Sequence, residues 1–385
     1  MKGIERLSFY TSRYYIDLKT LAAARGIDPD KYLVGLGQEK MSVAPPDEDV
    51  VTLAATSAKQ ALEGINREDI GMLLVATESG IDQSKALGIW VHHLLGLPKN
   101  ARVVELKQAC YAGCAGLQLG LSYLETHPNK KVLVIATDIA RYGLNSPGEP
   151  TQGCAAASFI LSTTAKLVAF EKEHGIFTSH VMDFWRPNYS ETAFVDGKFS
   201  TKIYLEALEE CWNSYKEASN RTFADHAKFC YHLPFVRMAL KAHERLAKLA
   251  EGEFDIAQVS DSFTYSRSVG NSYTASLFIG LASLLETSQE DLANKRIGFF
   301  SYGSGCVAEF FSGCVLPGYK AHLKADLHAQ ILHDRQALSL AEYEEFFNFR
   351  LPEDGSTFFC SPYNTKAFRL RGIDKHERLY EPTCC

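Results

Sequence analysis

Apolar residues recur in short runs along the chain, and polar residues bound each run. We expect four of these runs to be buried strands, because β-branched and aliphatic residues dominate them. They span residues 72–76, 131–136, 156–161 and 296–301. Apolar residues at helical spacing lie between the first two runs, over 83–95 and 112–124. This alternation of strands and helices predicts an α/β layered fold with a largely parallel sheet.

A similar order of elements returns in the second part of the chain. Helical patterns cover 202–218 and 235–250, and a further long helix is expected from Ser272, ahead of the strand near residue 296. We therefore predict two similarly built halves, residues 1–166 and 167–385. The prediction rests on the order of elements, because the sequence shows no residue-level repeat of fixed period.

Composition and charge narrow the class of protein. With 385 residues, 46% hydrophobic and 22% charged, the chain has the balance of a soluble globular protein. A formal net charge of -6 argues against a general binder of nucleic acid. Residues 1–15 lack the continuous apolar core of a signal peptide. The longest apolar stretch, 276–285, is about half of the roughly 20 residues that a membrane-spanning helix needs. We expect a cytoplasmic protein that partners neither nucleic acid nor membrane.

Ten cysteines are scattered along the chain without a CxxC pair, so we expect free thiols. Residues 326–385 are more charged than the rest and are expected to be loop-like and to pack on the surface. This segment ends in Cys384 and Cys385, to which the sequence assigns no role.

Cys110 is a candidate nucleophile. It follows an expected strand and directly precedes the helical pattern that starts at Ala112, which is rich in small residues. A thiol at a helix N-terminus faces the positive end of the helix dipole, which lowers its pKa and favours the reactive thiolate. The alternative is that Cys110 and Cys114 are small buried packing residues, the commoner fate of a free cysteine.

Three further polar residues lie where strands or loops end. His232 ends an expected strand before Pro234, Asn271 precedes a helix, and Glu78 ends the run 72–76. A histidine can hydrogen-bond a carbonyl, an asparagine amide can hold a developing oxyanion, and a buried carboxylate can take a proton from a thioester methyl. Each also has an ordinary interpretation, such as a helix cap for Asn271 or an exposed strand-end acid for Glu78. Together with a cysteine they form a site suited to acyl transfer.

The glycine-rich loop 301–306 follows a strand, so its backbone amides can approach a ligand closely. It does not match the fingerprint of a P-loop or of a dinucleotide-binding fold. The histidines and cysteines show no zinc-binding spacing, and the adjacent His92 and His93 diverge on a helix. We therefore predict neither a metal nor a redox cofactor.

Several short segments, in this order, resemble the hydroxymethylglutaryl-CoA synthases, and most closely the bacterial mevalonate-pathway type. The segments are Val75-Ala-Thr-Glu-Ser, Ala109-Cys-Tyr, Tyr142-Gly-Leu-Asn-Ser, Gly148-Glu-Pro-Thr-Gln-Gly, Asp183-Phe-Trp-Arg-Pro, His232-Leu-Pro-Phe and Phe300-Ser-Tyr-Gly-Ser-Gly. The ordered set carries the resemblance, which covers nearly the whole chain. It implies a thiolase-like fold of two related halves with layered αβαβα architecture, usually as a homodimer.

The resemblance also implies roles for individual residues. Cys110 would carry an acetyl group, Glu78 would be the general base that forms the acetyl enolate, and His232 would be the acid beside the acetoacetyl carbonyl. The acetyl group would then condense with acetoacetyl-CoA. After condensation, water would hydrolyse the enzyme thioester and release 3-hydroxy-3-methylglutaryl-CoA. The implied ligand contacts are Asn271 for the acetoacetyl group, Thr151, Ser200 and Ser304 for the ligand generally, and Asp28, Arg237 and Lys241 for coenzyme A.

Some positions depart from the pattern of that family. Gln108 replaces a usual glutamate, Cys114 stands where threonine is common, and Cys154-Ala155 replaces a small Ala-Gly pair. Lys107-Gln-Ala-Cys-Tyr also resembles the synthases that install β-branches on polyketides, whose acyl chain is held by a carrier protein. The chemistry of these residues is also compatible with a β-ketoacyl synthase, which needs no base at Glu78, and with a catalytically silent ligand-binding scaffold.

Overall fold

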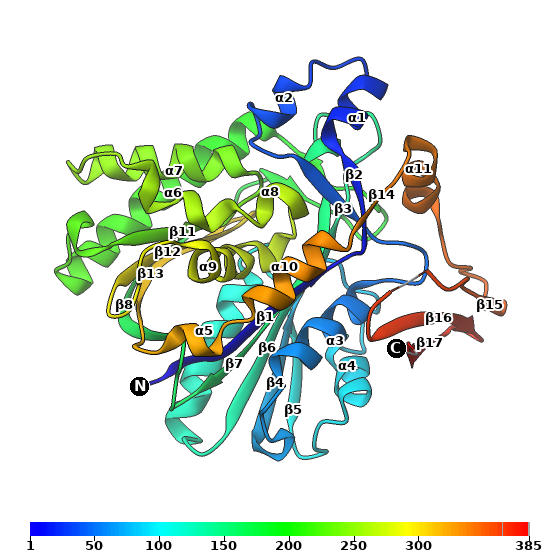
Figure 1. The fold of residues 1–385 in the computed structure, drawn as a ribbon, viewed down its shortest axis with the longest axis horizontal. Helices are drawn as coiled ribbons and strands as arrows, with labels where there is room; N and C mark the ends of the chain where they lie inside the picture. The colour runs from blue at the N-terminus through cyan, green and yellow to red at the C-terminus, as the bar shows by residue number, and fades with distance from the viewer. Residues whose placement is uncertain (364, 384–385) are drawn as a thin grey trace.

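The computed structural model describes residues 1–363 and 365–383 and is built around one nine-stranded sheet (Figure 1). The strand order is β11-β12-β13-β8-β1-β7-β6-β4-β5. In chain order these strands are β1 Gly3–Thr11, β4 Ile70–Ala76, β5 Arg102–Leu106, β6 Lys131–Ala140, β7 Gly153–Ser162, β8 Val168–Thr178, β11 Lys228–Tyr231, β12 Arg296–Gly303 and β13 Val307–Val315. Strands β1 and β8 share only two paired positions, so the sheet has one part on each side of this narrow join.

Helices cover both parts of the sheet in layers. Helices α3 (Val50–Ala61) and α4 (Gly88–Leu95) pack on one face of the β1 side, and α5 (Ala112–Thr126) packs on the opposite face. Helix α9 (Ser276–Thr287) lies beside α5 in the centre, where one apolar core joins the two parts. Helices α6 (Gly197–Ser219) and α7 (Val236–Leu249) cover the outer face of the β8 side. The order from one side to the other is therefore helix, sheet, helix, sheet, helix.

Smaller elements complete the described chain. Strands β2 (Tyr14–Asp17), β3 (Lys40–Val43) and β14 (Gln336–Ala337) form a second sheet, β9 (Phe184–Trp185) pairs with β10 (Phe194–Val195), and β15 (Phe358–Phe359), β16 (Phe368–Asp374) and β17 (Glu377–Pro382) form another. The remaining helices are α1 Leu18–Ala24, α2 Asp30–Leu33, α8 Ser266–Val269, α10 Ala325–His333 and α11 Leu340–Asn348.

The four expected strands are all present, but the prediction of a largely parallel sheet was wrong. Parallel pairing is found between β4 and β5, β4 and β6, and β11 and β12. The other five neighbouring pairs are antiparallel. Helical crossovers produce the parallel pairs, whereas short returns such as the one from β12 to β13 produce antiparallel ones. The division into halves at residue 166 stays a prediction.

Two predicted helices begin later than expected. The pattern over 83–95 gives a helix only from Gly88, because the Asp82 carboxylate accepts hydrogen bonds from the amides of Ser84 and Lys85 and holds a turn there. The helix expected from Ser272 begins at Ser276, after a short 3-10 turn. There the Asn271 Oδ1 accepts the amide of Tyr273, so in both cases a local hydrogen bond from the backbone to a side chain competes with the helix.

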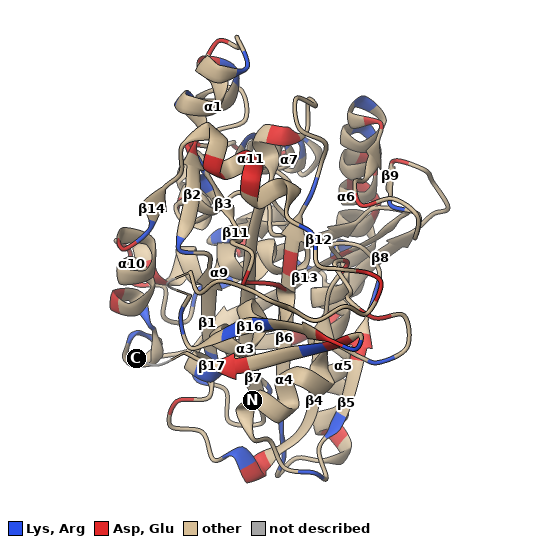
Figure 2. Cartoon of the chain, turned by 90° about the vertical axis from the view of Figure 1, so that its right-hand side faces the viewer, with Lys and Arg blue, Asp and Glu red and all other residues tan. Residues whose placement is uncertain are grey.

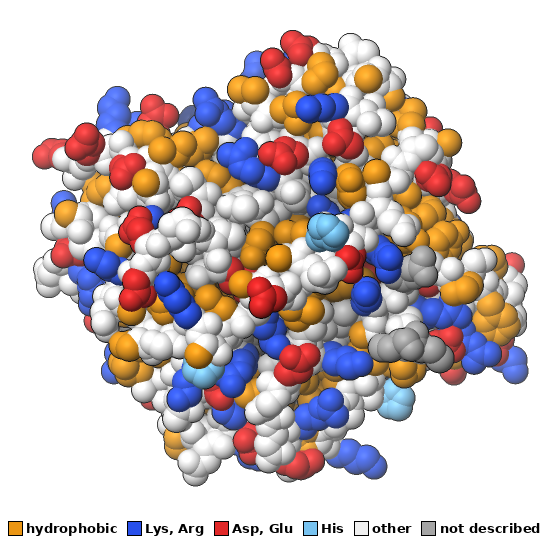
Figure 3. Space-filling view, in the orientation of Figure 1, with side chains coloured by type: hydrophobic (Ala, Val, Ile, Leu, Met, Phe, Trp, Pro, Cys, Tyr) orange, Lys and Arg blue, Asp and Glu red, His pale blue; other side chains and the backbone are white. Residues whose placement is uncertain are grey.

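The expectation of a loop-like segment after residue 326 was also wrong. Helices α10 and α11 and the hairpin of β16 and β17 lie within it, and His328 of α10 is fully buried against β1. Cys384 and Cys385 lie outside the described residues. Charged residues concentrate in the outer helices and loops, while the central strands are largely free of them (Figure 2). Acidic and basic side chains intermingle on the face seen in Figure 3. In the part of the chain that the structure describes, none of the helices is long and apolar enough to cross a membrane.

Candidate active site

Cys110 and Glu78 meet at the carboxyl ends of two parallel neighbouring strands. Cys110 lies in the turn between β5 and α5, and Glu78 follows β4 by two residues. The Cys110 Sγ donates a hydrogen bond to Glu78 Oε1 over 3.1 Å. Ala109, directly before the cysteine, has φ 43°, a conformation that a residue with a Cβ rarely adopts. This strained turn aims the thiol at the carboxylate.

The electrostatics of this pair correct one prediction. Burial and the neighbouring Glu78 raise the pKa of Cys110 well above its usual range, whereas the sequence predicts a lowered pKa. Burial, followed by the nearby Asp138 charge, raises the pKa of Glu78 to about 8. A helix N-terminus contributes much less than burial beside a carboxyl group. The resting site is therefore a protonated thiol bonded to a carboxyl group that can accept its proton.

Asp138 organises the base and was missed in the sequence. It lies near the carboxyl end of β6, which runs parallel to β4, and its Oδ1 accepts hydrogen bonds from the Glu78 amide at 2.9 Å and the Ser79 hydroxyl at 2.8 Å. Its Oδ2 accepts the amide of Thr274 at 3.0 Å. Thr274 lies three residues after Asn271. The buried Asp138 carboxylate therefore links the backbone at Glu78 to the segment that carries Asn271. The signal that selected Glu78, an acid at the end of an apolar strand, also marks Asp138.

His232 is held neutral inside the protein. It is 3% exposed, its Nδ1 lies 2.7 Å from the Ser276 hydroxyl, and its carbonyl accepts a hydrogen bond from Tyr204. Burial lowers the pKa of His232 to about 3. The imidazole is thus uncharged at neutral pH, and its predicted role as the acid beside the acetoacetyl carbonyl stays a prediction.

Cys110 and His232 line one cavity of about 440 Å³, which we call the nucleophile cavity. The structure also places four of the predicted ligand contacts on its wall: Thr151, Ser200, Asn271 and Ser304. The rings of Tyr142, Phe184 and Tyr273 pack edge to face with centroids 5.8 to 6.4 Å apart and form an apolar side of this cavity. Six of the ten predicted site residues therefore surround one space beside the thiol.

Asp183 supports this wall, although sequence reasoning gave it no role. Its buried carboxylate accepts hydrogen bonds from the hydroxyl of Ser200 at 3.1 Å, the hydroxyl of Tyr302 at 2.7 Å and the amide of Gly305 at 2.9 Å. It fixes the glycine-rich turn beside Ser304. The Asn271 Oδ1 accepts the amide of Tyr273 at 2.9 Å, so this residue caps a turn, as its ordinary interpretation predicts, and also faces the cavity.

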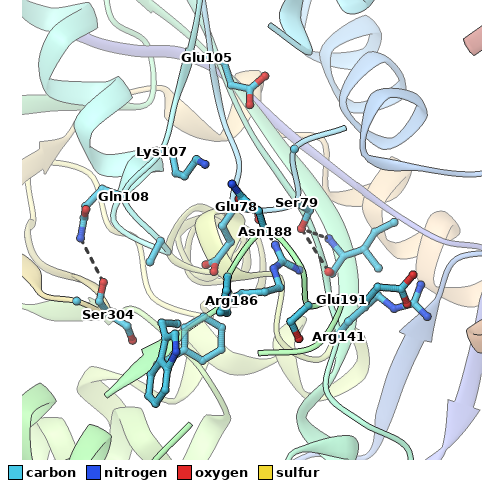
Figure 4. A pocket seen from close by; sticks show the side chains of 18 of the residues that line it. Glu78, Ser79, Glu105, Lys107, Gln108, Arg141, Arg186, Asn188, Glu191 and Ser304 are labelled. Carbon is cyan, nitrogen blue, oxygen red and sulfur yellow. Dashed lines mark hydrogen bonds between the residues drawn. The ribbon is translucent and has the colours of Figure 1, made fainter. Parts of the chain in front are cut away.

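Glu78 faces a second space of about 880 Å³, which we call the polar cavity (Figure 4). Charged and amide side chains dominate the part of its wall around Glu78, namely Glu105, Lys107, Gln108, Arg141, Arg186, Asn188 and Glu191. Ser304 and Phe184 line both cavities. An Arg186 guanidinium nitrogen donates to the carbonyl of Glu78. The nucleophile and the base thus stand between the nucleophile cavity and the polar cavity.

Three predicted coenzyme A contacts lie outside the lining of the nucleophile cavity. Arg237 and Lys241 are exposed one turn apart on α7, and the Arg237 amide donates to the carbonyl of Leu36, which lines the cavity. Asp28 is exposed, and its carboxylate accepts the amide of Asp30 at the start of α2. Their proposed contact with coenzyme A stays a prediction.

The positions that depart from the family pattern have definite partners. Gln108 Nε2 donates to the Ser304 carbonyl at 3.2 Å and links the nucleophile turn to the glycine-rich turn. Cys114 donates to the buried Glu309 carboxylate at 3.3 Å, and it faces neither cavity. Cys154 is fully buried in β7. Cys114 is therefore poorly placed to replace Cys110 as the nucleophile.

Comparisons with known proteins agree with this geometry. The family model described as hydroxymethylglutaryl-coenzyme A synthase N terminal matches residues 1–166, and the model for the C terminal of the same synthase matches residues 168–249 and 241–367. The hydroxymethylglutaryl-CoA synthase of Enterococcus faecalis is 43% identical over 357 residues, which cover 91% of this chain and 93% of that protein. The polyketide biosynthesis 3-hydroxy-3-methylglutaryl-ACP synthase PksG of Bacillus subtilis is 32% identical over 370 residues, covering 90% and 87%.

Solved structures extend the agreement to the fold. A crystal structure of HMG-CoA synthase complexed with CoA is 40% identical, has a TM-score of 0.95, and matches 99% of this chain and 100% of that one. MvaS in complex with 3-hydroxy-3-methylglutaryl coenzyme A is 38% identical, with a TM-score of 0.90 and 99% of each chain covered. The predicted thiolase-like layered fold is confirmed. The chain belongs to the hydroxymethylglutaryl-CoA synthase family.

Proposed function

We propose that this enzyme condenses acetyl-CoA with acetoacetyl-CoA to give 3-hydroxy-3-methylglutaryl-CoA through an acetyl thioester on Cys110. The observation that carries the proposal is the 3.1 Å hydrogen bond between Cys110 and Glu78, beside a cavity that His232 and Asn271 also line. A nucleophile next to a carboxylate of raised pKa is the arrangement needed for acyl transfer followed by proton abstraction.

The first step is attack of the Cys110 sulfur on the acetyl-CoA carbonyl. Glu78 accepts the thiol proton, and the bond between the sulfur and the acetyl carbon forms. The bond from that carbon to the coenzyme A sulfur breaks, and coenzyme A leaves as the thiol after taking the proton from Glu78. Acetylation removes the thiol that donates to Glu78. The carboxylate, once ionised again, then faces the acetyl group and can remove a proton from its methyl carbon. Holding the acetyl group and the base together in this way converts an unfavourable encounter into an intramolecular step.

The second step joins the acetyl carbon to the acceptor ketone. The developing alkoxide on the acetoacetyl group needs hydrogen-bond donors, and His232 and Asn271 face the same cavity as the thiol. A neutral His232 serves by hydrogen bonding and by supplying a proton that its surroundings can replace. Thr151, Ser200 and Ser304 contact the acyl chain, and Asp28, Arg237 and Lys241 meet coenzyme A outside the cavity.

The acceptor could instead be held on a carrier protein, as in the polyketide relative. The higher identity to the Enterococcus faecalis synthase than to PksG supports coenzyme A as the carrier. The test supplies acetyl-CoA together with either acetoacetyl-CoA or an acetoacetyl carrier protein and compares initial rates. We expect faster synthesis with acetoacetyl-CoA, and faster synthesis on the carrier protein would overturn this choice.

The remaining parts of the proposal concern the protein in the cell. We propose a cytoplasmic homodimer in the mevalonate route to isoprenoids, which uses its two coenzyme A thioesters as substrates and needs no metal or redox cofactor. The thiol, carboxyl and imidazole groups supply every proton transfer that the reaction requires. Light scattering of the purified protein tests the dimer, and retention of full activity after treatment with a chelator tests the independence from metal.

A further inference from the structure

A third cavity lies beside the polar cavity, and the proposed reaction gives it no ligand. Its volume is about 370 Å³, within the range of small-molecule sites, and we call it the side cavity. Residues of β3, α11, β16 and the segment before α3 form its wall. It shares Arg141 and Glu191 with the polar cavity, but neither Cys110 nor Glu78 lines it. The side cavity is therefore a space apart from the thiol and its base.

Apolar side chains form much of this wall. They are Met41, Val43, Phe346, Leu370 and Ile373, and each of them is buried. Contact with such side chains removes the apolar surface of a ligand from water, which is favourable. The side cavity can thus hold the hydrocarbon part of a small molecule.

Arg141 brings a positive charge to the side cavity without an acidic partner. Among the described residues, no carboxylate oxygen lies within ion-pair distance of its guanidinium group. One guanidinium nitrogen donates to the Phe347 carbonyl, the group lies 4.4 Å from the centroid of the Phe347 ring, and the buried Nε has no hydrogen-bond partner. Burial, followed by the charge of Arg350, lowers the pKa of Arg141 to about 10. The surroundings thus disfavour this cation, and a bound anion stabilises it.

The other charged side chains of this wall are already paired or lie in solvent. Arg350 donates to both carboxylate oxygens of Glu191, and Arg378 donates to Asp49 over 3.1 Å. Glu353 is exposed. One uncompensated positive charge remains, so a ligand with a single negative charge matches the side cavity better than a dianion or a neutral molecule.

Glu48 adds a second polar group to the wall. It is 5% exposed, and its Oε2 has no hydrogen-bond partner within the described residues. Burial, with the charges of Asp47 and Asp49, raises the pKa of Glu48 to about 8, so this carboxyl group carries a proton at neutral pH. A protonated carboxyl group donates a hydrogen bond, whereas an ionised one only accepts. Glu48 can therefore donate to an anion instead of repelling it.

We propose that the side cavity binds a small monocarboxylate with an apolar chain, which pairs with Arg141, accepts a hydrogen bond from Glu48 and packs its chain on the buried apolar wall. A planar carboxylate suits a guanidinium group, which presents its N–H donors in one plane. The side cavity is separate from the acyl-CoA chemistry, so this inference does not rest on the proposed function.

Hexanoate is the probe, and hexanamide is its uncharged counterpart. In ligand-observed NMR titrations of the full chain, hexanoate should bind, and hexanamide should bind at least about tenfold more weakly because it lacks the charge-assisted hydrogen bond. Excess acetoacetyl-CoA should leave the affinity for hexanoate unchanged, because the two ligands occupy different cavities. Displacement by acetoacetyl-CoA, equal binding of the two probes, or no binding of hexanoate would overturn the inference.

Two pairs of variants locate the site. Arg141→Gln should weaken hexanoate binding at least about tenfold. Its control, Arg371→Gln, removes a cation of β16 that is 53% exposed and outside the cavity lining, and should bind hexanoate as the wild type does. Glu48→Leu should weaken binding by a similar factor, whereas Glu48→Gln should not, because its amide still donates. Glu48 lines the side cavity and not the polar cavity, so this second pair distinguishes the two spaces.

Circular dichroism checks the fold of each variant, and either pair remains a test if a member of the other fails to fold. Wild-type affinity in folded Arg141→Gln would overturn the pairing with the carboxylate. Equal affinities of Glu48→Leu and Glu48→Gln would overturn the placement of the ligand in the side cavity. Neither result bears on the condensation, which acetylation of Cys110 tests separately.

Discussion

Glu78 and Glu48 are two carboxyl groups whose pKa values are both raised to about 8, with burial as the largest cause in each case. Their surroundings differ. Glu78 accepts a hydrogen bond from Cys110 and faces the polar cavity. Glu48 precedes α3 and lines a smaller cavity of about 370 Å³, and its Oε2 has no hydrogen-bond partner within the described residues.

The difference teaches that a raised pKa does not by itself identify a catalytic base. Burial, with the charges of Asp47 and Asp49, produces the shift at Glu48, where the neighbouring cavity residues include Phe346 and Leu370 and no thiol. At Glu78 the same shift coincides with a nucleophile in hydrogen-bond contact. Geometry therefore selects the base, and the pKa only shows that it can work near neutral pH.

Removal of the Cys110 thiol should cause the largest loss of activity among these variants. Cys110→Ala takes away the group that distinguishes the Glu78 region, and we expect acetyl transfer from labelled acetyl-CoA and overall synthesis to fall to background. Cys114→Ala is the control and should keep the label, because Cys114 faces neither cavity. Filter binding of radiolabelled protein measures both. Stoichiometric labelling of Cys110→Ala would show that the nucleophile was assigned wrongly.

The same isosteric substitution at the two carboxyl groups tests the comparison directly. Glu78→Gln should slow condensation by roughly 10²- to 10⁴-fold, the loss typical of a missing general base. It should still form acetyl-enzyme, because removal of the Glu78 charge lowers the pKa of Cys110 and the thiol can then lose its proton to solvent in place of Glu78. Glu48→Gln should keep both activities. The measurements are acetylation and product formation for each variant.

Two results would contradict this prediction. A folded Glu78→Gln enzyme that condenses at nearly the wild-type rate would refute the role of the base. A loss of condensation in Glu48→Gln as large as that in Glu78→Gln would show that burial of a carboxyl group, and not contact with the thiol, is what catalysis requires.

The sequence predicted the elements that position the site more successfully than the way they pair. Apolar runs identified β4, β6, β7 and β12 because a buried strand must be apolar on both faces. Whether two neighbouring strands pair parallel or antiparallel depends on the connection between them. The apolar residues of a run such as 156–161 do not indicate that connection. The parallel arrangement of the whole sheet was therefore predicted wrongly, while the fold class was right.

In the site, too, features set by neighbouring residues were predicted from the sequence, whereas contacts between distant residues were not. Glu78, Cys110 and His232 stand at strand ends, which local pattern can detect. Asp183 acts through partners at Ser200, Tyr302 and Gly305, which are far apart in the sequence. The pKa of Cys110 likewise depends on a carboxylate 32 residues away. Such effects follow from the folded arrangement and cannot be read from neighbouring residues.

His232→Ala tests a site group whose pKa is lowered by burial, whereas that of Glu78 is raised. We expect acetylation to persist and synthesis to fall by roughly 10²-fold through weaker use of acetoacetyl-CoA, the loss typical of one oxyanion donor. The wild-type rate should rise with pH through about 8, as Glu78 ionises, and the variant should keep that profile. The reason is that the pKa of His232 is lowered to about 3, so the imidazole is already neutral over this range. Rates from pH 6 to 9 test both parts, and a lost pH dependence would contradict the assignment.

The smallest expected effect is on stability, where the two carboxyl regions should behave alike. The pKa of each group rises from 4.5 in its ordinary state to about 8 in the fold, so the folded protein holds a proton that the unfolded chain has lost. Stability from this source is present below pH 4.5 and falls as the pH rises to about 8. Glutamine does not ionise, so Glu48→Gln and Glu78→Gln should each lose less thermal stability than the wild type between pH 5 and pH 9. Calorimetric melting temperatures at the two pH values measure this. Parallel losses in all three proteins would show that these carboxyl groups are not desolvated as described, and a relief confined to Glu78→Gln would show that only the region beside the thiol is.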